Sequence, residues 1–202
     1  MKRAQPIAPR QRILDAADDL FRRVGIRGVG VEAIAEAAGT NKMTLYRHFR
    51  SKDELIAAWV SGIVGEKEAA WEDIAAKNPD DPRAQLVDWS RRLAAIFAEL
   101  EERGSPLANA LAELPEPDHP ARLVIDAHRQ REHKRILRLC REAGFAEPEL
   151  VAHQFYFLLE GAKACVSCVG LKQTGEHLIR LVDSLVTTSR KGPARSTSGR
   201  RT

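Results

Sequence analysis

Hydrogen-bond donors that suit a polyanion are concentrated in one short stretch of this 202-residue chain. Between positions 42 and 48 stand Lys42, Thr44, Arg47 and His48. Lysine and arginine pair with phosphates, and hydroxyl and imidazole groups also bond to the base edges of DNA. Leu45 and Phe49 are spaced so that a helix buries both of them and turns the donors outward. The stretch therefore predicts an exposed helix face that contacts nucleic acid.

A second short helix is expected just before it, over residues 31–38. Its apolar face is formed by Val31, Ile34, Ala35 and Ala38. Gly39 suits the left-handed end of a helix, and Thr40 and Asn41 suit the N-cap of the next helix. Two helices joined by a short glycine turn form the helix-turn-helix pattern, whose second helix enters the DNA major groove.

Two longer helices must hold this pair in place. The first is expected over residues 9–24, with an apolar stripe at helical spacing. The other is expected from Ser51 to about residue 76, because Ser51 and Glu54 form a capping box. Lys52 is unfavourable at a helix N-terminus unless an anion lies close to it, and a DNA phosphate would supply that anion.

Charge is distributed unevenly along the chain. Residues 1–60 hold 11 Lys and Arg against 7 Asp and Glu, residues 61–187 hold 16 against 21, and residues 188–202 hold 5 against none. A basic end on an acidic body indicates that one part of the chain faces nucleic acid. A merely solvated basic surface would carry the same charges, so the charge alone leaves both interpretations open.

Composition favours an all-α protein, because Ala, Leu, Arg and Glu dominate and alternating strand patterns are almost absent. No apolar run approaches the roughly 18 residues that a membrane-spanning helix needs, and no apolar segment follows the basic N-terminus. The three cysteines are too few for a disulfide scaffold. We therefore expect a cytoplasmic protein with no membrane partner.

The run from Arg12 to Lys52 resembles the DNA-binding domain of TetR-family transcriptional regulators. The resemblance rests on the segments ILDAADDLF, IAEAAG, TLYRHF and SKDEL. It implies an all-α homodimer, with an N-terminal three-helix helix-turn-helix domain and a larger helical domain for ligand binding and dimerisation. The expected parts are a DNA-binding domain at 1–54 with a mobile arm at 1–8, an effector-binding and dimerisation domain at 55–189, and a disordered basic tail at 190–202.

The resemblance also implies which residues meet DNA. They are Thr40, Lys42, Met43, Thr44, Tyr46, Arg47 and His48, with Lys52 on the DNA backbone. For Tyr46 the alternative is a buried core ring. Family members often place Ser or Thr just before the second helix, where it caps the helix and bonds to phosphate. Gly30 stands there in this chain, so one expected contact is missing.

Further helices are expected in the body, where polar residues precede prolines. Their predicted ranges are 82–102, 106–114, 119–143, 147–169 and 175–189. In TetR-like bodies an effector pocket lies among the fifth to eighth helices. The candidate lining residues are Trp89, Leu93, Phe97, Leu107, Asn109, Leu111, His128 and Phe155. Such a lining suits a small organic effector, although ordinary core packing is the alternative for each residue, and His128 could instead bond to Glu132.

The last two helices are expected to form the dimer surface, because two such helices from each subunit would build a four-helix interface. The residues predicted for it are Leu158, Leu159, Ala162, Val166, Leu178, Val182 and Leu185. A monomer that buries these apolar faces internally is the alternative.

Catalytic residues, metal sites and cofactors are not expected. His128 and Glu132 share a helix face, but His133 is displaced by about 100° from Glu132, so the three do not converge on a metal. Cys165 and Cys168 lie in an apolar helical run without the positive surroundings that activate a thiol. We interpret them as buried small hydrophobes, with a redox sensor as the alternative.

Three functions follow from these features. The leading hypothesis is a repressor that binds near-palindromic double-stranded DNA as a homodimer and is released by a small organic effector. An activator or architectural DNA-binding protein without an effector is the second. A helical enzyme built on His128 and Glu132 is the third, although the chain shows no organised nucleophile.

Overall fold

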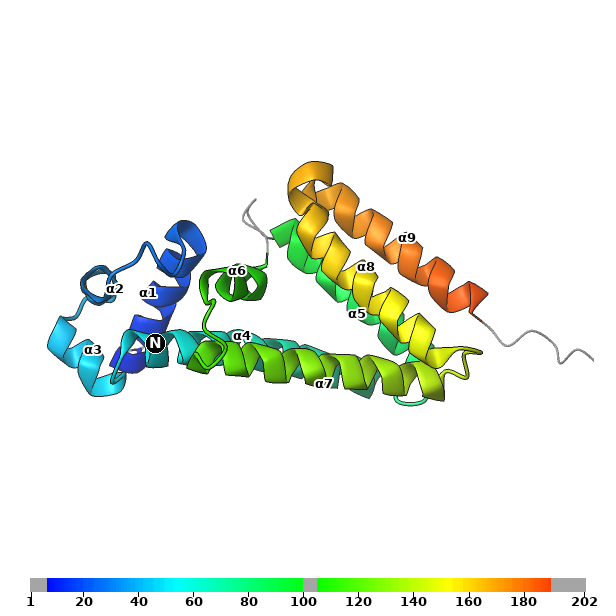
Figure 1. Ribbon diagram of the computed structural model, residues 1–202, viewed down its shortest axis with the longest axis horizontal. Coiled ribbons are helices and arrows are strands. Elements are labelled where there is room, and N and C mark those ends of the chain that lie inside the picture. The colour runs from blue at the N-terminus through cyan, green and yellow to red at the C-terminus, as the bar shows by residue number, and fades with distance from the viewer. Residues whose placement is uncertain (1–6, 100–104, 190–202) are drawn as a thin grey trace, which may run out of the picture. The chain divides into compact units, whose positions relative to one another are not determined.

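The computed structural model describes residues 7–99 and 105–189. Nine helices and no strand make up this described part (Figure 1). They are α1 (Pro9–Val24), α2 (Val31–Ala37), α3 (Lys42–His48), α4 (Lys52–Lys77), α5 (Pro82–Glu99), α6 (Pro106–Glu113), α7 (Pro120–Glu142), α8 (Pro148–Val169) and α9 (Leu171–Thr188). The all-α fold class is therefore confirmed. Most of the predicted arm, the end of the predicted 82–102 helix and the predicted tail lie outside the described residues.

Helix boundaries follow the local signals with one clear exception, the start of α9. We expected a helix from residue 175, but α9 begins at Leu171. Gly170, with φ +91°, ends α8 and also precedes the first turn of α9. Gly175 lies inside the helix, where a Cβ atom would come within 3.1 Å of Ala94 Cβ. Its role is close packing between α5 and α9, not chain reversal.

The described chain forms two compact units. The first comprises residues 7–70 and 105–130, and the second comprises residues 71–99 and 131–189. Both α4 and α7 therefore contribute residues to each unit.

The core of the first unit joins the helix-turn-helix to α6 and the start of α7. Ile13, Ile34 and Leu45 are fully buried, and the same cluster includes Leu107 and Ile125. Within it, the rings of Phe21 and Trp59 meet edge to face with 5.1 Å between their centroids. Trp59 Nε1 donates to Asp18 Oδ1 at 2.7 Å. The three N-terminal helices and α6 are thus packed on one shared core.

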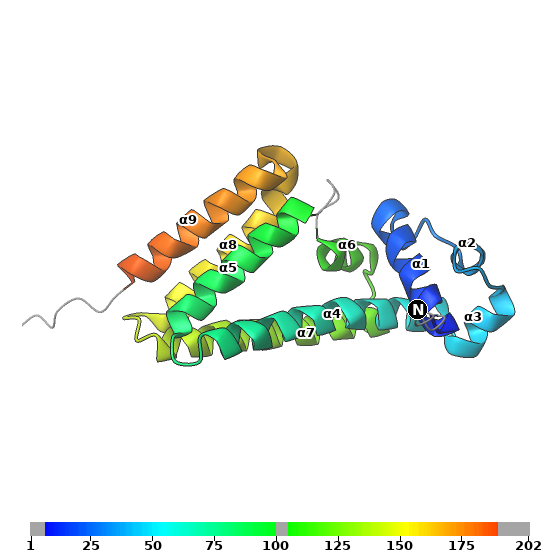
Figure 2. The ribbon, with the colours of Figure 1, turned by 180° about the vertical axis from the view of Figure 1, so that it is seen from behind.

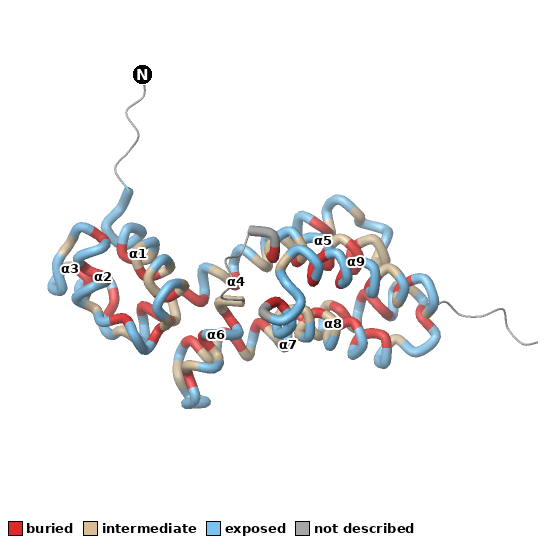
Figure 3. The backbone as a smooth tube through the Cα atoms, turned by 90° about the horizontal axis from the view of Figure 1, so that it is seen from above, coloured by how far each residue is buried: buried red, intermediate tan, exposed pale blue. Residues whose placement is uncertain are grey.

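The second unit is built on α5, α8 and α9, and α9 packs against both α5 and α8 (Figures 1 and 2). Buried and exposed positions alternate along these helices (Figure 3). Phe97, Phe155 and Val182 are at most 1% exposed. Trp71 stacks on Trp89 with 4.2 Å between ring centroids. Among the described helices, none is both long and apolar enough to cross a membrane.

Candidate nucleic-acid interface

The α2–α3 turn is closed by local hydrogen bonds. Gly39 takes the left-handed conformation with φ +62°, and the Thr40 N–H donates to the Ala35 carbonyl at 2.9 Å. Asn41 Oδ1 then accepts the Thr44 N–H at 2.9 Å and caps α3. The side chain at the cap thus satisfies one of the free N–H groups at the start of the helix. The predicted helix-turn-helix geometry is present.

The short helix α3 turns its donors outward. Leu45 and Phe49 are 0% and 1% exposed and anchor the helix in the core. The residues of the opposite side that are exposed are Lys42, Met43, Tyr46, Arg47 and His48, while Thr40 and Thr44 are half-buried. Tyr46 is 40% exposed, which excludes the alternative of a core ring. These seven residues, which were predicted to meet DNA, are thus all at least partly accessible in the structure, and we call the surface that they form the α3 face.

One acidic side chain reaches the α3 face from α2. Glu32 Oε1 lies 2.6 Å from Lys42 Nζ. This hydrogen bond raises the pKa of Lys42 and lowers the pKa of Glu32, so both groups stay charged at neutral pH. Glu32 was not among the predicted site residues, because no spacing rule links positions ten residues apart on two different helices.

Gly30 precedes α2 as its N-cap and provides no side-chain cap, as expected from the sequence. Its backbone is extended, with φ −86° and ψ 158°. A Cβ atom there would meet Glu32 Oε2 at 3.6 Å, an ordinary contact distance. A serine would therefore fit without strain at this position.

Lys52 lies at the start of α4 and binds within the protein. Its Nζ donates to the Ile26 carbonyl at 2.7 Å. An ammonium group has three N–H donors, so this bond leaves capacity for a phosphate. The neighbouring cap differs slightly from the expected capping box. Ser51 Oγ accepts the Glu54 N–H at 3.0 Å, but the Glu54 carboxylate accepts the N–H of Arg50 in place of that of Ser51.

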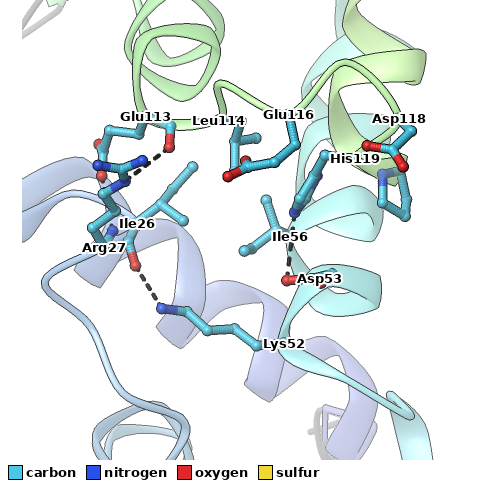
Figure 4. Close-up of a pocket in the computed structure, with 11 residues that line it drawn as sticks. Ile26, Arg27, Lys52, Asp53, Ile56, Glu113, Leu114, Glu116, Asp118 and His119 are labelled. Atoms are coloured by element: carbon cyan, nitrogen blue, oxygen red, sulfur yellow. Dashed lines mark hydrogen bonds and ion pairs between the residues drawn. The ribbon is translucent and has the colours of Figure 1, made fainter.

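A hollow of about 470 Å³ beside Lys52 shows how the loop before α2 is held (Figure 4). Glu113, at the end of α6, accepts the Arg27 N–H at 2.8 Å through its carboxylate, and its carbonyl accepts Arg27 Nε at 3.0 Å. On the other side of the hollow, His119 Nδ1 accepts the Ala121 N–H at 3.1 Å. His119 Nε2 then faces Asp53 Oδ1 at 3.4 Å. Sequence reasoning missed these contacts, because Arg27 and Glu113 are 86 residues apart.

The predicted effector residues are distributed over both units. In the first unit, Leu107 and His128 are buried, Leu111 is half-buried and Asn109 is exposed. In the second unit, Trp89, Leu93, Phe97 and Phe155 are buried.

Two buried polar groups of α7 do not pair with each other as suggested. His128 Nδ1 lies 3.2 Å from Glu68 Oε1 on α4, which corrects the suggested bond to Glu132. Glu132 is 3% exposed, and no described residue bonds to its Oε1. Arg135, one turn further along α7, lies over the ring of Trp71 at 5.3 Å. Among the described residues, no group of three His, Cys, Asp or Glu side chains is placed to hold a metal ion.

The predicted dimer residues require a correction. Leu159, Val166, Leu178 and Val182 are at most 5% exposed inside a single chain, so they do not form an outward face. Leu158, Ala162 and Leu185 are half-buried. The large apolar side chains that α8 and α9 leave exposed are Leu150, Phe157, Val169 and Leu181. The main apolar stripes of α8 and α9 are therefore buried within the subunit.

The interpretation of Cys165 and Cys168 as buried hydrophobes is wrong, because both are exposed on α8. Cys168 Sγ donates to the Cys165 carbonyl at 3.2 Å. Cys140 is the buried cysteine, and burial raises its pKa to about 12. The apolar run that contains Cys165 and Cys168 covers the whole circumference of the helix, and only one side of it faces the core.

Comparison with known proteins supports the same reading of the N-terminal helices. Residues 13–59 match the family described as bacterial regulatory proteins, tetR family. The transcriptional repressor KstR2 of Rhodococcus jostii is 34% identical over 98 residues, which cover 44% of this chain and 48% of KstR2. A transcriptional regulator of Mycobacterium tuberculosis, Rv1255c, is 47% identical over 49 residues, or 24% of either chain. The matched stretch thus spans less than half of each curated relative.

Solved structures extend the similarity to the body. SCO4454, a TetR-family transcriptional regulator from Streptomyces coelicolor, superposes with a TM-score of 0.85 at 26% identity. The superposition covers 91% of this chain and 96% of SCO4454.

Proposed function

We propose that this chain is a member of the TetR family of bacterial regulatory proteins, and that it is a sequence-specific, DNA-binding transcriptional regulator and not an enzyme. The observation that carries the proposal is the α3 face. Lys42, Arg47 and His48 are exposed there on a helix that Leu45 anchors in the core. Such a helix is the part of a helix-turn-helix that enters the major groove. The protein acts where the DNA is, which for a bacterial regulator is the cytoplasm.

The active form is a homodimer that represses transcription. Two copies of α3 about 34 Å apart read a near-palindromic operator. The exposed residues Phe157 and Leu181 provide apolar surface for the partner subunit. Repression is favoured by the similarity to KstR2, which is named a repressor.

A small organic effector releases the operator. Support comes from the contact between α6 and the loop that precedes α2, where Glu113 binds Arg27 through both its carboxylate and its carbonyl. An effector that displaces α6 therefore acts directly on the segment leading into the helix-turn-helix. A compound screen that measures both the melting temperature and operator binding tests this step. The absence of any compound that changes both would favour a regulator without an effector.

To test DNA binding, the purified protein is incubated with genomic fragments, and the fragments that it retains are sequenced. Their common sequence defines the duplex used in the binding measurements. Arg47→Ala and Lys42→Ala should each weaken binding to that duplex by at least about five-fold, because a lost base or phosphate contact costs about 1–3 kcal/mol. Arg92→Ala on α5 removes an exposed arginine far along the chain and serves as the matched control. Binding at the wild-type level by both α3 variants would refute the assignment.

A further inference from the structure

The α3 face contains a carboxylate as well as donors. Glu32, in the first turn of α2, keeps 67% of its side chain exposed although it contacts Lys42, whose side chain is 54% exposed. The two groups are 2.6 Å apart. Lys42 Nζ also lies 6.0 Å from the centre of the Tyr46 ring. Glu32 therefore lies among the groups that would meet DNA.

An exposed ion pair of this kind contributes little to folding. The start of a helix favours a negative charge, which suits Glu32 at the first turn of α2. On a DNA-binding surface, however, a carboxylate is repelled by phosphates. The Glu32 carboxylate also pairs with the Lys42 ammonium group, which would otherwise neutralise a DNA phosphate. The pair is thus unfavourable for binding to the DNA backbone and nearly neutral for the fold.

We propose that Glu32 is a counter-charge that neutralises Lys42 in the free protein, so that Lys42 attracts a DNA phosphate less strongly while the pair persists. Non-specific binding depends almost entirely on neutralisation of DNA phosphates, so Glu32 lowers the affinity of the protein for random-sequence DNA. Removing the Glu32 charge should therefore tighten binding to random-sequence DNA.

This inference rests on the proposed role of the α3 face. Its test uses full-length protein and a fluorescent random-sequence duplex of about three helical turns, so that no operator needs to be known. Binding is titrated between about 50 and 200 mM salt. The proteins compared are the wild type, Glu32→Gln, Lys42→Gln, the variant that carries both of these changes, Glu36→Gln and Arg47→Ala.

Glu32→Gln should bind the random duplex more tightly than the wild type, with a steeper salt dependence. One additional phosphate contact adds about 0.9 to the slope of log K against log salt, so the gain should shrink about three- to four-fold across that salt range. In the Lys42→Gln background the gain should largely disappear, because the released cation is no longer present.

Glu36→Gln is the matched control, since it removes the same charge from an exposed position one turn further along α2. An equal gain from Glu36→Gln would show a simple effect of net charge and overturn the proposal. A gain from Glu32→Gln that persists without Lys42, or no gain at all, would also overturn it. If Lys42→Gln and Arg47→Ala both bound as the wild type does, the α3 assignment itself would fail. Unchanged melting temperatures would show that the variants remain folded.

Discussion

At the scale of single residues, the α3 face combines features that sequence predicts with one that it does not. Leu45 and the Asn41 cap were predictable, because both follow from spacing along one helix. The pair of Glu32 with Lys42 was not, because contacts between side chains on different helices depend on how those helices cross. The same holds for Arg27 and Glu113. Residue types thus identified the donors, and only the structure shows what else lies among them.

Gly30→Ser should restore the missing cap. The extended backbone at Gly30 suits an N-cap serine, and a Cβ atom fits there. Serine stabilises an N-cap by a few tenths of a kcal/mol relative to glycine, and its hydroxyl can also donate to a phosphate. We expect a slightly higher free energy of unfolding in denaturant titration and tighter DNA binding.

Gly30→Ala is the control for this substitution, since alanine adds the Cβ atom without the hydroxyl. It should not increase either quantity. If the alanine variant matched the serine variant in both measurements, the capping explanation would be wrong.

Cys140 should be the last of the three cysteines to react with a thiol reagent. Burial raises its pKa to about 12, so in the folded protein its thiolate is scarce at pH 8 and gains population only as the pH rises toward that value. Ellman titration should show Cys140 reacting only after denaturant is added, and Cys140→Ala should leave labelling of the folded protein unchanged. Rapid reaction of all three thiols in the native state would contradict the buried position.

At the scale of elements, helix existence was easier to predict than the role of each glycine. Prolines near the first turn marked the starts of α1, α5, α6, α7 and α8. The predicted ranges left residues 170–174 outside any helix, but the chain leaves the helical conformation only at Gly170. The sequence does not distinguish a glycine that ends a helix from one that packs inside a helix. The close contact of Gly175 with Ala94 is therefore visible only in the structure.

Gly175→Val should destabilise the protein by about 1–3 kcal/mol, because added methyl groups would be forced against Ala94. Gly65→Val on α4 is the matched control, since nothing lies within 4 Å of a Cβ atom there. That variant should be neutral or slightly stabilising, because valine has a better helix propensity than glycine. Thermal unfolding measures both. A Gly175→Val variant as stable as Gly65→Val would show that α5 and α9 do not pack closely.

At the scale of the whole molecule, the fold class followed from composition and periodicity, while the outward surface of the body did not. An amphipathic stripe shows which side of a helix is buried, but not whether another helix of the same chain or a partner buries it. Leu159, Val166 and Val182 were therefore predicted to face a partner subunit, whereas they are buried within a single chain. The exposed residues Phe157 and Leu181 now take the place of that set in the dimer prediction.

Phe157→Arg with Leu181→Arg should weaken the dimer without unfolding the subunit, because both side chains are more than half exposed, at 71% and 52%. Light scattering after size-exclusion chromatography should show a larger monomer fraction. Leu123→Arg on α7, where the side chain is 55% exposed, is the matched control and should leave the mass unchanged. A double variant that remained fully dimeric would place the interface elsewhere.

Dimethyl sulfate footprinting of a duplex enriched by the protein tests whether α3 reads the major groove, because the reagent methylates guanine N7 in the major groove and adenine N3 in the minor groove. We expect two protected major-groove stretches about one helical turn apart, both lost in Arg47→Ala. Protection of the minor groove only, or a pattern that Arg47→Ala leaves unchanged, would contradict it.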